Sequence, residues 1–343
     1  MTAETNVAHF GQRQLALDTV AEAFSEPQLA EVFSLSGERI DPTNDHLVPF
    51  YLAHGEVQVP GAKEPVKYTI SVATDLKSPN LHLIVPGFGG SKWTSKRMRN
   101  AFSSEESSAA ASYQPARVSS SLESHLSGLL DAQKLHVDTI GAIIDDLPQN
   151  KQLEDLPNHS DISLDKVVLD AHSMGFIAAS RYALAHPQNV ALINSIAGVG
   201  LEEPSPGRFA RRYLPAIKDE LLPAIMQAQF GEDYSSLDIA CRAIRYYGRN
   251  PLRTVGEMIS CMVADVRPQM TALRILGVKL GMLCLEKDKL LPPKLSIEGA
   301  SQLVDHYEVI LDAGHIAPQT KPLEVAHRLS QITHRLLFSG LKV

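Results

Sequence analysis

Short apolar runs and amphipathic stretches alternate along most of the chain. Two segments, Gly55–Val59 and Val66–Ala73, alternate apolar and polar positions and carry β-branched residues, which predicts strands. Further strands are predicted at Leu81–Val85, Lys166–Asp170, Val190–Ile196, Val278–Leu285 and Tyr307–Leu311. Apolar residues at helical spacing predict helices at Ser127–Leu147, at Phe176–His186 and from Leu323 onward. This alternation indicates an α/β fold, in which a mostly parallel sheet carries helices on both faces.

Three regions do not follow this alternation of predicted strands and helices. Residues 1–50 have apolar spacing that predicts helix, and residues 103–122 are rich in Ser and Ala. The Ser/Ala-rich composition of residues 103–122 predicts a surface loop or a loose helical connection, with a short strand at Ala116–Ser119. Residues 201–270 predict several helices separated by prolines, as expected of a helical insertion at one edge of the sheet. The expected units are therefore an N-terminal extension (1–50), a core (51–200 and 271–343) and an insertion (201–270).

Composition narrows the classes of function. The chain has 343 residues, 44% of them hydrophobic, which suits one large domain with an insertion and argues against disorder. Its 32 basic and 39 acidic residues leave a net charge of −7, so nucleic acid is an unfavourable partner. Cys241, Cys261 and Cys284 have no disulfide or metal-ligand spacing, and we expect buried thiols and no metal.

We expect no signal for export or membrane insertion in the given sequence. Its first residues lack a basic segment followed by an apolar core, and no apolar run approaches the roughly 20 residues that span a bilayer. A cytoplasmic protein without a membrane span is the expectation.

The pentapeptide Ala171-His172-Ser173-Met174-Gly175 lies between a predicted strand and a predicted helix. Small residues at its two ends permit a tight strand-to-helix turn, which strains the backbone of the central serine and projects its hydroxyl above the sheet. The start of the helix also favours negative charge that develops beside the serine. Ser173 is therefore a candidate nucleophile.

A serine nucleophile needs a base, and the base needs an acid that orients it. In this architecture the acid and then the histidine follow later strands. Asp288 follows the strand that ends near Leu285, and His315 follows the last predicted strand beside a glycine. We expect His315 to be the base and Asp288 the acid. The other carboxylates that could serve are Glu286, Asp265 and, least favoured, Asp312.

Backbone amides must stabilise the oxyanion that acyl transfer creates. The amide of Met174, directly after the serine, is one candidate donor. The second is the amide of Phe88, with Gly89 next, because the glycines of this segment allow close approach to a ligand. This segment lacks the spacing of a nucleotide-binding loop, so no cofactor is expected.

The segments PGFGG, AHSMG, EKDKLLP and DAGH, in this order, make the chain resemble the capped Ser-His-Asp members of the α/β-hydrolase superfamily. The resemblance runs from about residue 55 to the C-terminus. It implies an eight-stranded, mostly parallel sheet and a helical cap, here residues 201–270. Ala171 stands where glycine is commoner, and Pro86 where many members have histidine. Serine at position 173 excludes the aspartate-nucleophile chemistry of dehalogenases and epoxide hydrolases.

The expected function is hydrolysis of a carboxylic ester or thioester with a small to medium apolar acyl group, through an acyl-enzyme intermediate. Carbon–carbon bond hydrolysis or perhydrolysis on the same triad is an alternative, as is a non-catalytic ligand-binding role; the oligomeric state is open. Arg242, Arg245 and Arg249 share a helix face that is more typical of a solvated surface than of an anion site. An apolar stripe in the cap suits an acyl chain and core packing equally: Leu214, Ile217, Leu221, Leu222, Ile225 and Met226.

Overall fold

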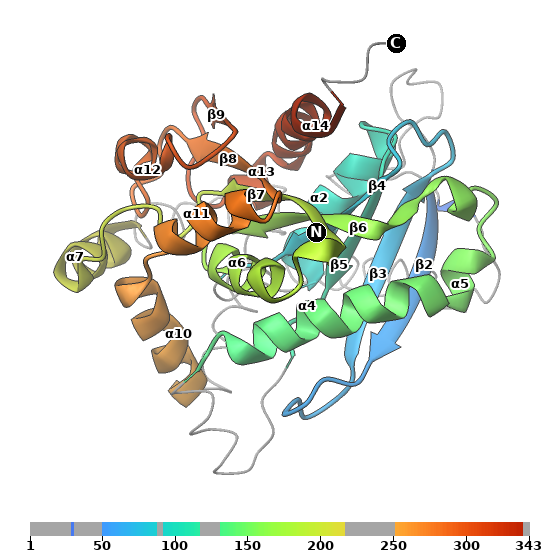
Figure 1. Ribbon diagram of the computed structural model, residues 1–343, viewed down its shortest axis with the longest axis horizontal. Helices are drawn as coiled ribbons and strands as arrows, with labels where there is room; N and C mark the ends of the chain where they lie inside the picture. Colours follow the sequence, from blue (N-terminus) through green and yellow to red (C-terminus); the bar gives the residue numbers. More distant parts are fainter. Residues whose placement is uncertain (1–28, 31–49, 88–91, 117–130, 217–250, 339–343) are drawn as a thin grey trace, which may run out of the picture.

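The computed structural model describes residues 29–30, 50–87, 92–116, 131–216 and 251–338. Within these residues, nine strands form one sheet in the order β1-β2-β3-β5-β4-β6-β7-β8-β9 (Figure 1). The strands from β5 across to β9 run parallel, whereas β1, β2 and β3 pair antiparallel. Strands β2 to β9 make the expected eight-stranded sheet, and β1 adds two residues at its edge. The bounds are β1 Leu29–Ala30, β2 Phe50–Val57, β3 Val66–Ala73, β4 Asn80–Val85, β5 Ala109–Tyr113, β6 Ser163–His172, β7 Val190–Ile196, β8 Lys279–Leu285 and β9 His306–Ile310.

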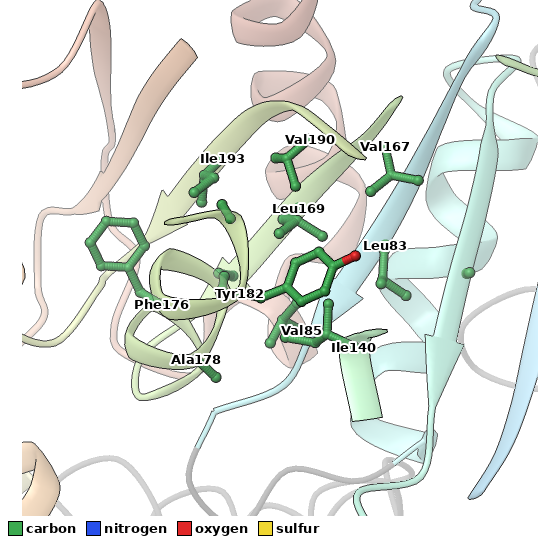
Figure 2. Packing of buried hydrophobic residues seen from close by; sticks show 14 of the residues in the cluster. Leu83, Val85, Ile140, Val167, Leu169, Phe176, Ala178, Tyr182, Val190 and Ile193 are labelled. Carbon is green, nitrogen blue, oxygen red and sulfur yellow. The ribbon is translucent and has the colours of Figure 1, made fainter. Parts of the chain in front are cut away.

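Helices cover both faces of the sheet (Figure 1). Helices α4 and α6 enclose the larger apolar core with one face, and α2 and α14 enclose a second core with the other. Figure 2 shows strand residues Leu83 and Leu169 packed beside Ile140 of α4 and Tyr182 of α6. The α-helical bounds are α2 Lys92–Ser104, α4 Lys134–Asp146, α5 Lys151–Glu154, α6 Gly175–Ala185, α7 Pro206–Ala216, α10 Pro251–Val263, α11 Arg267–Ile275, α12 Pro293–Ala300, α13 Ala317–Thr320 and α14 Pro322–Phe338.

The Ser/Ala-rich region folds differently from the sequence expectation. Its described strand is β5, Ala109–Tyr113; Ala116 lies after that strand, and residues 117–119 of the predicted short strand lie outside the described part. All five residues of β5 are buried, and helix α2 packs against them. Alanine has little intrinsic preference for strands, so burial between β3, β4 and α2 decides the conformation here. The predicted helix at Ser127–Leu147 also starts later, with α4 at Lys134, while residues 127–130 lie outside the described part.

The two flanking units are described only in part. Most of residues 1–50 lie outside the described residues, but Leu29–Ala30 form strand β1, so the helical expectation is wrong for these two residues. Helices α7, α10 and α11 lie within or at the end of residues 201–270, as the helical expectation requires. That this segment caps the site stays a prediction.

The expected thiols and the membrane expectation can be compared with the described residues. Cys261 and Cys284 are free and buried, and Cys241 lies outside the described part. In the described residues, no helix combines the length and the apolar character needed to span a membrane.

Candidate active site

Ser173 lies at the turn between strand β6 and helix α6. Its φ of 52° is in the left-handed region, which a residue other than glycine adopts only under constraint. The surrounding backbone supplies that constraint. The Ser173 amide donates to the Ile196 carbonyl at 2.9 Å, and the Ser173 carbonyl accepts from the amides of Phe176 and Val199, each at 3.2 Å. The hydroxyl is thereby fixed at the carboxyl end of the parallel strands.

Gly175 allows this turn to pass close to strand β4. A Cβ at position 175 would lie 2.7 Å from the carbonyl oxygens of both Val85 and Pro86, closer than any real contact allows. The small residue expected at the end of the pentapeptide is therefore required by the packing of α6 against β4.

The structure brings Ser173, His315 and Asp288 together in that order. Ser173 Oγ lies 3.0 Å from His315 Nε2, and His315 Nδ1 lies 2.8 Å from Asp288 Oδ2. Ser173 and Asp288 are buried, while the His315 side chain is 14% exposed. Because a carboxylate only accepts hydrogen bonds, His315 Nδ1 carries the proton, which leaves the Nε2 lone pair facing the serine hydroxyl. This is the geometry of a general base and its orienting acid.

Asp288 is held by the loop that follows strand β8. Its second oxygen, Oδ1, accepts hydrogen bonds from the amides of Leu290 and Leu291 at 2.9 and 2.8 Å. These bonds fix the carboxylate plane, so that Oδ2 is directed at His315. Burial and the nearby Asp288 charge raise the pKa of the Cys284 thiol to about 12, so this thiol stays protonated at neutral pH.

The rival carboxylates have other partners. Glu286 is exposed and accepts the amide of Asp312 at 2.8 Å, and Asp312 pairs with Lys287. Asp265 pairs with Arg267 at 2.8 Å, which lowers the pKa of that carboxyl. None of these three carboxylates is the one hydrogen-bonded to His315 in the described residues.

The candidate oxyanion donors are only partly described. Met174 directly precedes helix α6, in a position where amides lack partners within the helix. Phe88 and Gly89 lie outside the described residues, so their role as donors stays a prediction. Gly87, directly before them, lies against the nucleophile: a Cβ there would be 2.9 Å from Ser173 Cβ.

The sequence analysis gave no role to His172, which the structure places beside the triad. Its Nε2 lies 2.9 Å from the carbonyl oxygen of His315, and the two imidazole rings are 5.0 Å apart between centroids. The available signal was its position directly before Ser173. A strand that ends at the nucleophile also carries its preceding side chain to the same edge of the sheet.

A narrow pocket lies where α7 and α10 meet the loop after β7. Val199 is one of the residues that line this pocket, and its amide donates a hydrogen bond to the Ser173 carbonyl. Apolar residues such as Val199, Phe209 and Met262 line the pocket together with Glu202, Glu203 and Ser205, and its volume of about 10 Å³ has room for about one water molecule. The predicted Arg face at residues 242–249, and the apolar stripe beyond Leu214, lie outside the described residues.

The chain is similar to known proteins of one family. The model of the Alpha/beta hydrolase family matches residues 83–328, more than half of the chain. A search of curated proteins finds no match. A thermophilic esterase from Thermogutta terrifontis, bound to malate, has a similar structure with a TM-score of 0.57 at 14% identity, covering 82% of this chain and 98% of the esterase.

Two further solved structures have a similar fold. Proline iminopeptidase from Mycobacterium smegmatis gives a TM-score of 0.58 at 11% identity, covering 84% of this chain and 100% of that protein. The enol-lactonase from Burkholderia xenovorans LB400 gives 0.55 at 13% identity, covering 82% and 99%. Likeness at such low identity shows the fold alone. The family match and the sheet topology agree, and the chain belongs to the alpha/beta hydrolase family.

Proposed function

We propose that this chain is a serine hydrolase that cleaves a carboxylic ester, or a thioester, of a small to medium apolar acyl group. The observation that carries the proposal is the hydrogen-bonded series from Ser173 through His315 to Asp288, with distances of 3.0 and 2.8 Å. A strained serine turn supports it, because strain of this kind concentrates at functional sites.

The reaction proceeds in two steps. Ser173 Oγ attacks the carbonyl carbon while His315 Nε2 accepts the hydroxyl proton, and Asp288 stabilises the resulting imidazolium. The Met174 amide, and on our proposal that of Phe88, donate to the oxyanion. His315 then protonates the leaving alkoxide or thiolate. In the second step His315 takes a proton from water, the hydroxide attacks the acyl-enzyme, and the acid leaves as Ser173 recovers its proton.

The proposed preference for an apolar acyl group rests on the apolar residues of the segment that we propose as the cap, residues 201–270. Among its described residues, Phe209 of α7 is buried and Met262 of α10 is partly buried against the core. An apolar acyl group that contacts such residues loses water-exposed surface, which stabilises binding. Ester and lactone chemistry is also named for two of the similar structures, the esterase and the enol-lactonase.

A fluorophosphonate probe tests the nucleophile without knowledge of the natural substrate. We expect the probe to label Ser173, identified by peptide mass spectrometry, and we expect Ser173→Ala to abolish labelling. The matched control, Ser301→Ala, removes a hydroxyl just after α12 and should label at the wild-type rate. Unlabelled wild-type protein would favour the non-catalytic alternative.

Nitrophenyl esters of graded chain length test the substrate class. We expect turnover to peak at short to medium chains, and Ser173→Ala to lower it on the order of 10⁴- to 10⁶-fold. Hydrolysis of acyl-CoA, formation of a peracid and cleavage of a vinylogous diketone are measured in parallel. A protein that labels with the probe but prefers one of the latter two reactions would carry perhydrolase or carbon–carbon hydrolase activity instead.

A further inference from the structure

His172 lies where three segments of the site meet. It ends strand β6 directly before Ser173, and its Nε2 lies 2.9 Å from the His315 carbonyl oxygen. On its other side is the backbone of Gly87: a Cβ built there would be 3.1 Å from His172 Nδ1. The imidazole therefore fills the space between the nucleophile turn, the loop that carries the base and the segment that leads to the predicted oxyanion donors.

The chemistry of the contact defines the state of this ring. A carbonyl oxygen only accepts hydrogen bonds, so His172 Nε2 carries a proton and donates it. Burial, with a smaller effect from neighbouring His315, lowers the pKa of His172 to about 3. The ring is thus neutral at the pH at which a histidine base works, and it adds no positive charge beside the imidazolium that His315 becomes during catalysis.

Two further hydrogen bonds hold the base loop at residues on either side of His315. The Lys287 amide donates to the Ala313 carbonyl at 2.8 Å, and the Ala317 amide donates to the Gly314 carbonyl at 3.0 Å. His172 contacts the backbone of His315 itself. The bond therefore constrains the Cα from which the catalytic imidazole extends toward Ser173.

We propose that His172 is a positioning residue, whose Nε2–H donates to the His315 carbonyl and holds the base within hydrogen-bond distance of the nucleophile. This inference rests on the proposed serine-hydrolase function. A displacement of about 1 Å between reacting groups can lower a rate roughly 100-fold, so one buried hydrogen bond at this point has a large effect on turnover.

Two substitutions separate the hydrogen bond from the shape of the ring. His172→Phe keeps an aromatic ring and removes the donor, whereas His172→Gln places an amide N–H at a similar distance from Cα. We expect His172→Phe to lower the rate constant of fluorophosphonate labelling roughly 10- to 100-fold, and His172→Gln to stay within about threefold of wild type. With a nitrophenyl ester, kcat should fall in His172→Phe while KM changes less than about threefold.

The outcomes distinguish this inference from the proposed function. Wild-type labelling rates in a folded His172→Phe, or equal losses in the Phe and Gln variants, would overturn the positioning role and leave the serine-hydrolase proposal intact. A wild-type protein that does not label, like Ser173→Ala, would overturn both. Thermal unfolding monitored by circular dichroism confirms that the compared variants are folded. If His172 had only a structural role, its substitutions would lower the stability of the protein, and His172→Gln would not selectively recover the labelling rate.

Discussion

A single backbone conformation underlies the candidate site at the scale of the residue. Ser173 adopts a φ of 52°, and three backbone hydrogen bonds from β7, α6 and the loop after β7 hold it there. A strained residue persists only when its surroundings determine it this strongly. The same crowding explains why the neighbouring positions Gly87 and Gly175 tolerate no side chain.

Gly175→Ala should therefore destabilise the protein. Its Cβ would collide with the carbonyls of Val85 and Pro86, which belong to backbone and cannot rotate away. We expect a loss of about 1–3 kcal/mol in the free energy of unfolding, measured by urea titration. Gly207→Ala is the control, because its Cβ in α7 meets only the end of the Arg211 side chain, at 3.9 Å. Equal stability of the two variants would contradict the prediction.

Asp288→Asn should separate orientation from folding. The Asn side chain can still accept the amides of Leu290 and Leu291, but its NH₂ group would then face His315 and favour the wrong imidazole tautomer. We expect kcat with a nitrophenyl ester to fall about 10⁴-fold at nearly unchanged thermal stability. Asp265→Asn, which lies outside the triad, should retain activity. If it lost activity as severely as Asp288→Asn, the assignment of the acid would be wrong.

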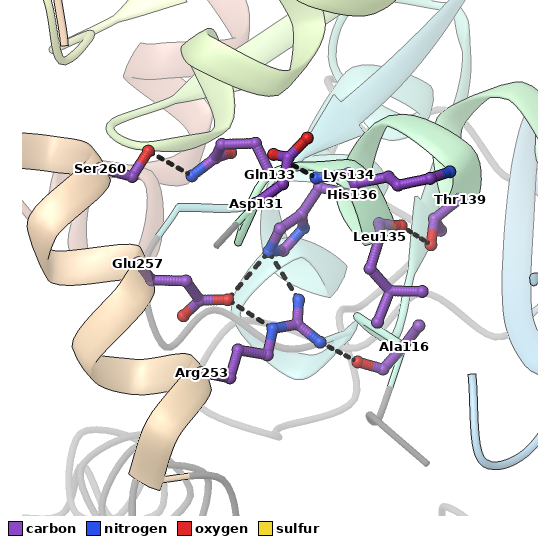
Figure 3. A network of polar contacts seen from close by, with 10 residues as sticks. All are labelled: Ala116, Asp131, Gln133, Lys134, Leu135, His136, Thr139, Arg253, Glu257 and Ser260. Atoms are coloured by element: carbon purple, nitrogen blue, oxygen red, sulfur yellow. Dashed lines mark hydrogen bonds and ion pairs between the residues drawn. The ribbon is translucent and has the colours of Figure 1, made fainter. Parts of the chain in front are cut away.

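At the scale of the element, helix α10 is attached to the core by buried charges. Figure 3 shows Arg253 between Glu257 of the same helix and His136 of α4. Arg253 Nε donates to Glu257 Oε1 at 2.7 Å, Nη1 donates to the Ala116 carbonyl at 2.6 Å, and Nη2 donates to His136 Nε2 at 2.9 Å. Burial lowers the pKa of His136, which keeps the ring neutral and able to accept this bond. Polar contacts thus dock the last part of the proposed cap against α4.

Glu257→Ala should destabilise the protein strongly, because it leaves the Arg253 charge buried without its carboxylate. Breaking a buried pair in this way costs about 3–5 kcal/mol in the free energy of unfolding. The double variant Arg253→Met with Glu257→Leu should recover most of this loss, since no buried charge remains. Glu298→Ala removes an exposed pair with Lys294 and should change stability by less than about 1 kcal/mol. Chemical denaturation of all three variants measures the differences.

At the scale of the whole molecule, the fold buries neutral histidines that the unfolded chain exposes. His172 and His136 both have pKa values lowered by burial, that of His172 from 6.5 to about 3. Between these two pH values the unfolded chain binds a proton at His172 and the folded chain does not. The unfolded state therefore gains stability relative to the folded state as the pH falls.

We expect the free energy of unfolding to decrease as the pH is lowered from about 6.5. For His172 alone the linkage amounts to about 2 kcal/mol between pH 6.5 and pH 5. His172→Gln cannot take up this proton, so its stability should fall less over the same range. Denaturant titrations at a series of pH values measure both slopes. Identical slopes in the wild-type protein and the Gln variant would show that His172 does not contribute.

Local signals in the sequence predicted most of the elements that carry the candidate site. Val190–Ile196 forms β7 as predicted, and the last strand lies within one residue of its expected bounds. Strand β7 is central in the parallel sheet and almost fully buried, so its apolar run is unambiguous, whereas β9 is an edge strand of which only Ile310 is buried. The Ala-rich strand β5 was missed because alanine lacks such a signal, and only its neighbours in the sheet make it extended.

The sequence by itself identified the groups on which the proposed chemistry depends: a serine between small residues at a strand-to-helix turn, followed by a carboxylate and a histidine after later strands. These features depend on local sterics and chain order, which short segments encode. The tertiary structure alone decided that Asp288 rather than Glu286 meets His315, and that His172 supports the base loop. His172 and His315 are more than a hundred residues apart in the chain, and Asp288 and His315 lie in loops after two different strands. Only the assembled sheet brings these segments together, so no local sequence pattern contains the information.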